Sequence, residues 1–340
     1  MHRCLQLAQM GAGHVAPNPV VGAVLVYKEV IIGEGFHRQY GQAHAEVNCI
    51  NSVSNANRHF IEDSTLYVSL EPCAHFGKTP PCADLIIKNN IPKVVIGCRD
   101  SYKEVAGKGI EKLKAAGVQV TVGVLEKEAL ELNKRFFTFH EQRRPYIILK
   151  WAQSADKKVG SKNNERIFIS NAISNRQVHQ WRSEEAAILV GTNTALHDDP
   201  ALTNRLVPGK NPVRLVIDME LKLPASLQLF NGSVKTIVFN AVKDEVNGHL
   251  LFCKISNNNI IPQILSILYH QNIQSVIVEG GAKLLQSFID ENLWDEGRVI
   301  TNTTLTIGDG LTAPQLKNEQ LINNIFLDTD NIEYFLNNKR

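Results

Sequence analysis

Apolar residues in the first 140 positions alternate between short β-type runs and segments with helical spacing. The runs at 20–26 and 30–33 flank the polar pair Lys28-Glu29, which predicts a β-hairpin. Further strands are expected at 65–70, 93–97 and 118–122, and helices at 5–10, 44–50, 83–88, 108–116 and 126–141. Strands that alternate with helices predict a layered α/β domain.

The pattern restarts after residue 143. Arg143-Arg144-Pro145 interrupts a charged helical stretch, and a new strand is expected at 146–151. Four more strands are expected at 186–190, 213–217, 236–239 and 275–278, and a helix at 282–289 follows two glycines. The sequence therefore predicts two α/β domains, residues 1–143 and 144–340.

Composition narrows the class of protein. The chain has 340 residues, of which 44% are hydrophobic and 21% charged, so it is globular and long enough for two cores. Thirty-six Lys and Arg against 34 Asp and Glu give a net charge of +2, which favours neither nucleic acid nor an acidic membrane as a partner. No apolar stretch approaches the roughly 20 residues of a membrane span, and the N-terminus lacks a signal-peptide pattern. Six cysteines predict no disulfide scaffold and are typical of a cytoplasmic protein.

Three residues of the first half have the spacing and chemistry of a zinc site. His44 begins an apolar helix, and Cys73 and Cys82 flank an eight-residue insertion, with Cys82 opening a helix after two prolines. One imidazole and two thiolates are three ligands for tetrahedral zinc and leave the fourth position for water, which is the pattern of a catalytic site. Glu46, close to the metal but not bound to it, would take a proton from that water and pass it to a leaving amine.

On the residues alone, a structural zinc site with His75 as fourth ligand stays open as an alternative. The remaining cysteines are interpreted as small buried apolar side chains, as single cysteines usually are.

His44-Ala-Glu46, followed by Pro72-Cys73 and Cys82, resembles the signature of zinc-dependent nucleobase deaminases. With the long insertion between the cysteines, the segments at 16–22 (APNPVVG) and 105–109 (VAGKG) make the chain resemble the RibD family to about residue 290. In that family a pyrimidine deaminase is fused to a pyrimidine reductase of riboflavin biosynthesis. The resemblance implies an N-terminal cytidine-deaminase-like α/β/α domain and a C-terminal α/β domain similar to dihydrofolate reductase.

For the first domain, the resemblance implies hydrolytic deamination of 2,5-diamino-6-(5-phosphoribosylamino)pyrimidin-4(3H)-one. Asn18 would contact the ribose or the ring, and His37 and Lys78 would meet the 5-phosphate. Two plainer interpretations stay open, because a loop Asn commonly forms turns and a loop Lys is commonly solvated.

The second half contains no G-x-G-x-x-G motif after a strand, which argues against a Rossmann-type site. Instead, a strand at 275–278 leads through Gly280-Gly281 into a helix, whose N-terminus could hold a phosphate. Such glycines also occur for packing alone, so the motif becomes specific only through the family resemblance.

The resemblance implies an NADPH-dependent reductase that converts a ribosyl side chain to ribityl. Its expected NADPH-binding residues are Gln153, Phe168, Thr194, Asp198, Gly281, Ala282, Lys283, Leu284, Leu285, Gln286 and Ser287. Its expected substrate-binding residues are Lys150, Arg166, Arg182, Leu202, Arg205 and Glu279. Lys150, on an apolar strand, is interpreted either as a site lysine or as an edge-strand lysine that faces water.

Four positions depart from the family pattern, all in the second half. Lys157 stands where the family usually has Gly, Arg166 replaces a small hydroxyl residue, Phe168 replaces Trp, and Met219 replaces Ser. These changes concern cofactor affinity and activity of the reductase and leave the deaminase motifs intact.

Two alternatives accompany the bifunctional enzyme. One is a zinc deaminase of nucleobases or tRNA whose C-terminal half is a non-catalytic module for ligand binding or dimerisation, and the other is a structural zinc protein. The expected partner is a phosphoribosylated pyrimidine, with homo-oligomerisation through the reductase domain as a further expectation.

Overall fold

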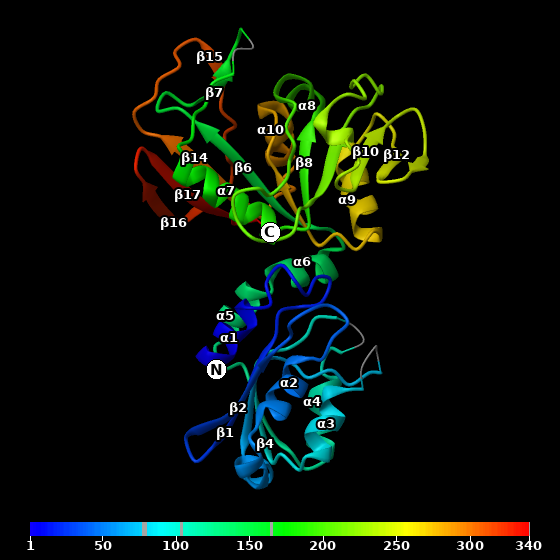
Figure 1. Ribbon diagram of the computed structural model, residues 1–340, viewed down its shortest axis with the longest axis vertical. Coiled ribbons are helices and arrows are strands. Elements are labelled where there is room, and N and C mark those ends of the chain that lie inside the picture. Colours follow the sequence, from blue (N-terminus) through cyan, green and yellow to red (C-terminus); the bar gives the residue numbers. More distant parts are fainter. Residues whose placement is uncertain (77–79, 103–104, 164–165, 340) are drawn as a thin grey trace. The chain divides into compact units, whose positions relative to one another are not determined.

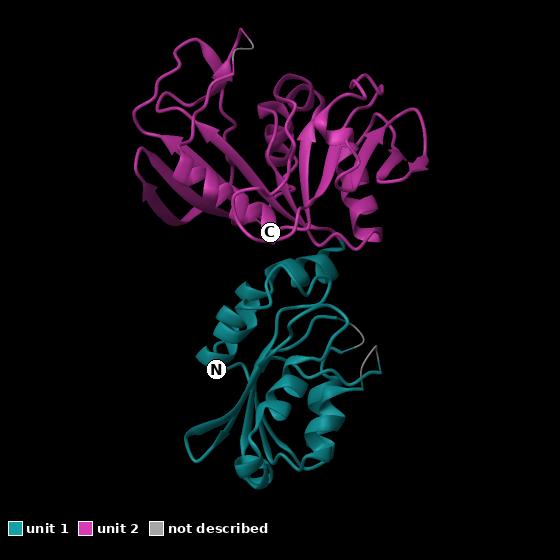
Figure 2. Cartoon of the chain, in the orientation of Figure 1, with its two compact units in different colours: residues 1–143 teal, residues 144–340 magenta. Residues whose placement is uncertain are grey.

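The chain divides into two units, Met1–Arg143 and Arg144–Arg340 (Figure 2). The computed structural model describes residues 1–76, 80–102, 105–163 and 166–339. Within these ranges no helix combines the length and the apolar character that crossing a membrane requires.

A five-stranded sheet with the order β2-β1-β3-β4-β5 forms the centre of unit 1. Its strands are β1 (Gly22–Tyr27), β2 (Val30–Phe36), β3 (Thr65–Leu70), β4 (Lys93–Cys98) and β5 (Gln119–Val122). The predicted hairpin of β1 and β2 is confirmed, and both turn residues, Lys28 and Glu29, have positive φ. A turn with two left-handed residues matches the twist of the paired strands.

Helices cover both faces of this sheet, so the predicted α/β/α layering is confirmed (Figure 1). The helices α2 (Ala45–Ser52), α3 (Cys82–Lys88) and α4 (Lys108–Ala115) pack on one face. On the other face lie α1 (His2–Gln9), α5 (Glu126–Leu132) and α6 (Lys134–Gln142), and a 3-10 helix, η1 (Asn55–Asp63), precedes β3.

The single helix expected at 126–141 is in fact two helices, α5 and α6, which meet at Asn133. The Asn133 side chain accepts a hydrogen bond from the Val20 N–H and donates one to the Val20 carbonyl, each at 2.9 Å. These two bonds tie the junction of α5 and α6 to the chain at Val20.

Unit 2 contains a ten-stranded sheet with the order β11-β12-β10-β9-β8-β13-β6-β14-β17-β16. The strands are β6 (Tyr146–Gln153), β8 (Ala187–Gly191), β9 (Val213–Ile217), β10 (Thr236–Asn240), β11 (Glu245–Asn247), β12 (Leu250–Lys254), β13 (Ser275–Val278), β14 (Glu296–Asn302), β16 (Glu319–Leu327) and β17 (Asp330–Asn337). A separate pair consists of β7 (Lys158–Ser161) and β15 (Gly310–Thr312), and a 3-10 turn, η2 (Gln228–Phe230), lies between β9 and β10. The parallel core from β12 to β14 contains the strands expected from the sequence, whereas the C-terminal antiparallel strands were not predicted.

Alternate residues of the central strand β6 face opposite helical layers. Ile147, Leu149 and Trp151 pack in one core with α9 (Ile260–His270) and α10 (Ala282–Asp290). Tyr146 and Ile148 pack in the other core with α7 (Ala172–Glu184) and α8 (Thr192–Asp198). Lys150 shares the second face through the two-residue period of a strand, so it lies on the α7 side.

Candidate functional site

The structure brings His44, Cys73 and Cys82 together as one potential metal site. Their ligand atoms all lie within 4.8 Å of one another. His44 Nδ1 is 3.6 Å from the Cys73 Sγ and 3.3 Å from the Cys82 Sγ. A tetrahedral zinc with bonds of about 2.3 Å to sulfur and about 2.05 Å to nitrogen would separate these atoms by about 3.6 Å. The donor set and its spacing therefore fit zinc.

Two helix N-termini position these ligands. His44 is the N-cap residue of α2 and Cys82 is the first residue of α3, as the sequence predicted. The Cys82 N–H donates to the Cys73 Sγ at 3.3 Å. Hydrogen bonds from the Cys82 thiol and then from His44 lower the pKa of Cys73 to about 4, so this pair of thiols loses its first proton readily.

Glu46 lies two residues after His44, in the first turn of α2, and is buried, with 3% of its surface exposed. Burial and the charge of Cys73 raise the pKa of its carboxyl. Its carboxylate is outside the group of mutually close ligand atoms, which is what a proton carrier beside the metal requires.

No fourth protein ligand joins the cluster among the described residues. His75, the candidate for a structural site, packs edge-on against Tyr102 with a centroid separation of 6.4 Å. The alternative of a closed structural zinc site is therefore wrong for the described part of the chain, and one coordination position is left for water or substrate.

Asn18 and His37, predicted to bind substrate, lie next to each other near this cluster. The His37 Nδ1 bonds to the Ala43 carbonyl at 3.1 Å, and Asn18 Nδ2 lies 3.2 Å from His37 Nε2. The His37 ring packs edge-on against His44 at 5.4 Å. Lys78, the third predicted contact, lies outside the described residues.

Glu71 is a site residue that the sequence analysis missed. This buried carboxylate accepts four backbone N–H bonds, from Asp100 at 3.3 Å, Gly107 at 3.0 Å, Gly109 at 3.1 Å and Ile110 at 3.3 Å. It thereby fastens the loop that begins with Cys73 to the start of α4. The glycine-rich 105–109 segment, noted in the sequence, supplies two of the four donors, Gly107 and Gly109, but no local pattern marks Glu71 as their partner.

The same contact explains Gly109. A Cβ at this position would lie 1.9 Å from the Pro72 carbonyl oxygen, so only glycine lets the two backbones approach. The 105–109 segment, first noted as a family marker, is thus a support for the cysteine loop.

In unit 2, Lys150, Arg182 and Glu279 form a buried ionic cluster. Arg182 donates to both Glu279 oxygens, at 2.9 and 2.6 Å, and Lys150 Nζ lies 3.6 Å from Glu279 Oε2. Although burial acts to raise it, the charges of Arg182 and Lys150 hold the pKa of Glu279 at about 2. Lys150 lies on a central strand, so its interpretation as an edge-strand lysine facing water is wrong.

A loop after α8 carries two more predicted substrate residues. Leu202 is buried and has φ of 49°, an uncommon conformation for a non-glycine residue. Arg205 is exposed, and its Nη1 donates to the Thr203 hydroxyl at 3.0 Å. Arg182 reaches the same loop, with Nη1 3.4 Å from the Thr203 carbonyl oxygen.

The predicted cofactor residues Thr194 and Gly281 also meet. A Cβ on Gly280 would lie 2.8 Å from Thr194 Cγ2, and one on Gly281 would lie 3.4 Å from Thr194 Oγ1. Gly281 has φ of 70° and caps the N-terminus of α10. This glycine turn and helix start leave bare backbone N–H groups at the carboxyl ends of β8 and β13, where parallel sheets commonly bind ligands.

Other predicted residues of unit 2 lie in different surroundings. Gln153 is buried and uses both ends of its amide, with Trp151 and Thr301. Asp198 is exposed on α8. Phe168 is 76% exposed and lies under the Arg166 guanidinium, 5.0 Å from the ring centroid.

Comparison with known proteins identifies both units. Residues 1–98 match the cytidine and deoxycytidylate deaminase zinc-binding region, and residues 145–332 match the RibD C-terminal domain. The riboflavin biosynthesis protein RibD of Aquifex aeolicus is 41% identical over 325 residues, which cover 93% of this chain and 89% of that protein. The chain belongs to the RibD family.

Solved structures agree with this assignment over both units. A diaminohydroxyphosphoribosylaminopyrimidine deaminase/5-amino-6-(5-phosphoribosylamino)uracil reductase from Thermotoga maritima has a TM-score of 0.90 at 36% identity, covering 99% of this chain and 97% of that chain. Acinetobacter baumannii RibD has a TM-score of 0.89 at 31% identity, covering 98% and 97%. The chain is thus a bifunctional deaminase and reductase of riboflavin biosynthesis, with a zinc-binding deaminase region and an NADPH-using RibD reductase domain of the dihydrofolate-reductase type.

RibD membership also decides between the interpretations left open by the sequence. A nucleobase or tRNA deaminase with a non-catalytic C-terminal module would not match RibD proteins along its whole length, as this chain does. Of the four departures expected from the sequence, Lys157 has φ of 59°, in the left-handed region that favours glycine.

Proposed function

We propose that residues 1–143 deaminate 2,5-diamino-6-(5-phosphoribosylamino)pyrimidin-4(3H)-one and that residues 144–340 reduce the ribosyl side chain of the product with NADPH. The activities named for the Thermotoga maritima relative support this substrate. The single observation that carries the proposal is the three-ligand His44/Cys73/Cys82 cluster with Glu46 buried beside it.

In the deaminase, His44, Cys73 and Cys82 would hold zinc. When bound, zinc supplies a water that ionises near neutral pH. The Glu46 carboxyl would accept a proton and deliver it to the amine that leaves as ammonia. Its burial keeps bulk water away from the carboxyl, so the proton stays available for the leaving group.

Asn18 and His37 would orient the substrate. The bond between the His37 ring and the Ala43 carbonyl favours a proton on Nδ1, which leaves Nε2 to accept from the Asn18 amide. The amide is thereby held with its oxygen free to accept a hydrogen bond from the ribose or the ring. Lys78 is proposed as a phosphate contact from the sequence alone.

In the reductase, Thr194 and the turn into α10 would hold NADPH, together with Phe168, Gln153 and Asp198 as further contacts. The proposed α10 residues are Gly281, Ala282, Lys283, Leu284, Leu285, Gln286 and Ser287. When bound, NADPH supplies the hydride for the ribosyl side chain. The turn suits a phosphate because its glycines leave the N–H groups uncovered.

The substrate of the reductase would lie against Lys150, Arg182, Leu202, Arg205 and Glu279, with Arg166 at the edge. Lys150 and Arg182 carry two positive charges against the single negative charge of Glu279, and Arg205 adds another nearby. This excess of positive charge suits a phosphorylated ligand.

Parallel measurements of ammonia release and NADPH oxidation test the proposal. The diaminopyrimidine phosphate is incubated with zinc-loaded protein and NADPH, and both signals are expected. Glu46→Gln should retain zinc and release no ammonia from the diaminopyrimidine, yet oxidise NADPH when the aminouracil product is supplied directly. The exposed control Glu62→Gln should keep both activities. Ammonia release by Glu46→Gln at the wild-type rate would contradict the role of Glu46.

We also propose that two copies associate through the reductase unit. The strand β16 forms one end of the ten-stranded sheet, and it exposes Leu321, Ile322, Ile325 and Phe326. An edge strand with apolar side chains is a template for pairing with a second copy. Light scattering should show a dimer for the wild type and a monomer for Phe326→Lys, and a wild-type monomer at micromolar concentration would refute the pairing.

The proposed location is the cytoplasm. All six cysteines are free thiols, and five of them are buried, as expected in a reducing compartment. Fractionation of cells that express the chain tests this directly, because recovery outside the cytoplasmic fraction would contradict it.

A further inference from the structure

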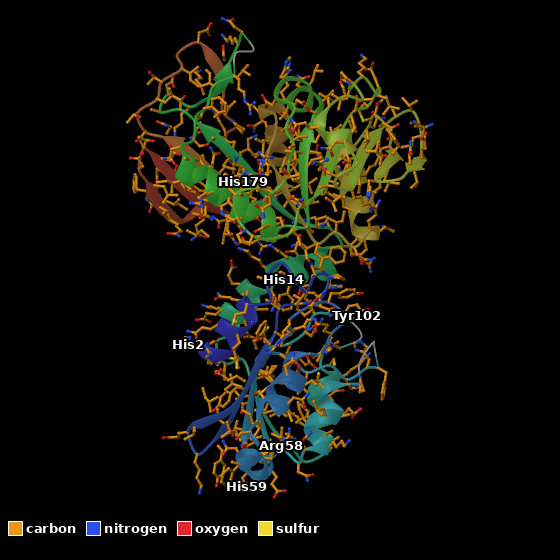
Figure 3. The ribbon with its side chains drawn as sticks, viewed as in Figure 1. His2, His14, Arg58, His59, Tyr102 and His179 are labelled. Carbon is orange, nitrogen blue, oxygen red and sulfur yellow. The ribbon has the colours of Figure 1, made fainter. Side chains whose placement is uncertain are left out.

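His179 is next to two of the proposed substrate residues of the reductase, Arg182 and Arg205, but is not itself one of the proposed site residues. It lies on α7 (Figure 3). Only 6% of its surface is exposed. Its Nδ1 accepts a hydrogen bond of 2.9 Å from the backbone N–H of Arg205. A backbone N–H can only donate, so the imidazole must be neutral at Nδ1 for this bond to exist.

The loop that this bond holds is under conformational strain. Leu202 has φ of 49°, in the left-handed region that non-glycine residues without a short polar side chain seldom adopt. Strained backbone at a site persists only where its surroundings hold it in place. The loop therefore needs contacts that hold it in place around Leu202 and Arg205.

Two side chains of α7 provide these contacts. His179 and Arg182 are three residues apart, so they lie on the same face of the helix. Arg182 donates from Nη1 to the Thr203 carbonyl and from Nε and Nη2 to Glu279. His179 accepts from the N–H of Arg205, two residues after Thr203. The ionic cluster and the loop are thus connected through one helical turn.

We propose that His179 is a positioning residue of the reductase: by accepting from the Arg205 N–H, it fixes the Leu202–Arg205 loop against α7 and so places the Arg205 guanidinium for the substrate phosphate. The proposal rests on the proposed reductase function of unit 2. His179 does not touch the reacting atoms in this role, so its loss weakens substrate binding more than it slows the chemical step.

Protonation of His179 would remove the acceptor. Burial lowers its pKa, and the charges of Arg182 on its own helix and Arg205 on the loop lower it further, whereas Asn204 and Glu279 act in the opposite direction. The neutral form is therefore the one present near neutral pH. As the pH falls through this lowered pKa, the bond to Arg205 is lost and two arginines face a third positive charge.

The isosteric pair His179→Asn and His179→Leu tests the proposal in the full chain. Asn places an acceptor oxygen where the imidazole has Nδ1, and Leu has the same shape without an acceptor. We expect His179→Leu to raise the reductase KM for the aminouracil phosphate about tenfold with little change in kcat, as loss of one buried hydrogen bond predicts. His179→Asn should retain the wild-type KM, and a kcat close to that of wild type in both variants serves as the internal control for folding of unit 2.

A pH series supplies the readout that a purely structural role would not move. The wild-type KM should rise on acidification relative to that of His179→Asn, which has no group to protonate, while the substrate phosphate titrates equally in both. Equal KM values for the Asn and Leu variants, or parallel pH profiles for wild type and His179→Asn, would overturn the proposal. A Leu variant that fails to fold leaves this pH comparison as the deciding measurement.

Calorimetric binding of the aminouracil phosphate without NADPH separates this inference from the reductase assignment. If wild-type protein binds this ligand but oxidises no NADPH, the reductase function fails, and weaker binding by His179→Leu than by His179→Asn still supports the positioning role. If NADPH is oxidised and both variants bind like wild type, the positioning role fails and the reductase function stands.

Discussion

Replacing Glu71 by Gln removes one carboxylate oxygen from a cluster of four backbone N–H groups. Oε1 accepts from Gly109 and Ile110, and Oε2 accepts from Asp100 and Gly107. A carboxamide has a single acceptor oxygen, so its NH₂ group must face two N–H donors that lose their partner.

The magnitude follows from these two orphaned donors. A buried N–H without a partner costs about 1–3 kcal/mol, and the Gly107 bond is only partly buried. We therefore expect the free energy of unfolding of unit 1 to fall by about 2–4 kcal/mol. At about 4 °C per kcal/mol, the melting temperature of this unit should fall by about 8–16 °C. Because Glu71 holds the loop that carries Cys73, zinc affinity should fall about 10-fold to 100-fold.

Calorimetry and zinc competition with a chromophoric chelator measure the two effects on the same samples. Glu111→Gln is the matched control, because Glu111 is an exposed carboxylate in the first turn of α4. Both substitutions remove one negative charge, so the two variants are compared at equal net charge. Wild-type zinc affinity in a destabilised Glu71→Gln protein would show that the carboxylate supports the fold but does not position Cys73. If the melting temperature of Glu71→Gln also equalled that of wild type, the hydrogen-bond argument would be refuted.

Three further predictions concern single positions. Lys157→Gly should stabilise unit 2 by about 0.5–1 kcal/mol relative to Lys157→Ala, because φ of 59° strains any Cβ and the Ala variant controls for the lost charge; equal urea midpoints would contradict this. Gly109→Ala should lower the free energy of unfolding of unit 1 by about 2 kcal/mol or more, because its Cβ would clash with the Pro72 carbonyl. A urea midpoint like that of wild type would show that the backbone shifts to make room for the Cβ. The pKa of Glu279 is lowered from 4.5 to about 2, so its ionised form stabilises the fold by roughly 3 kcal/mol above about pH 4.5. This contribution is lost as the pH falls toward 2. Glu279→Gln should flatten the curve of unfolding free energy against pH over that window, and identical curves for the variant and wild type would refute the linkage.

Helices and strands with strong local signals were predictable from the chain alone. The runs that became β3, β9 and β13 are short segments rich in Val, Ile and Leu, and their observed bounds equal the expected ones. The break at Asn133 did not show in the local pattern, and the partner of its side chain, Val20, is more than a hundred residues away in sequence. Exposed strands such as β16 lack alternating apolar residues, so their pairing with β17 shows only in the sheet.

The zinc-binding motif follows from local sequence, since His44 and Cys82 each stand at a helix start and one imidazole with two thiolates is a donor set that suits zinc. What the tertiary structure decided is which charges and backbone groups face one another. Whether Lys150 met water or a carboxylate depended on the position of β6 in the sheet, and Glu71 became a support only when α4 offered its N–H groups. Such partners are distant in sequence, and their contact free energies exist only after the chain has folded, so no local pattern of residues encodes them.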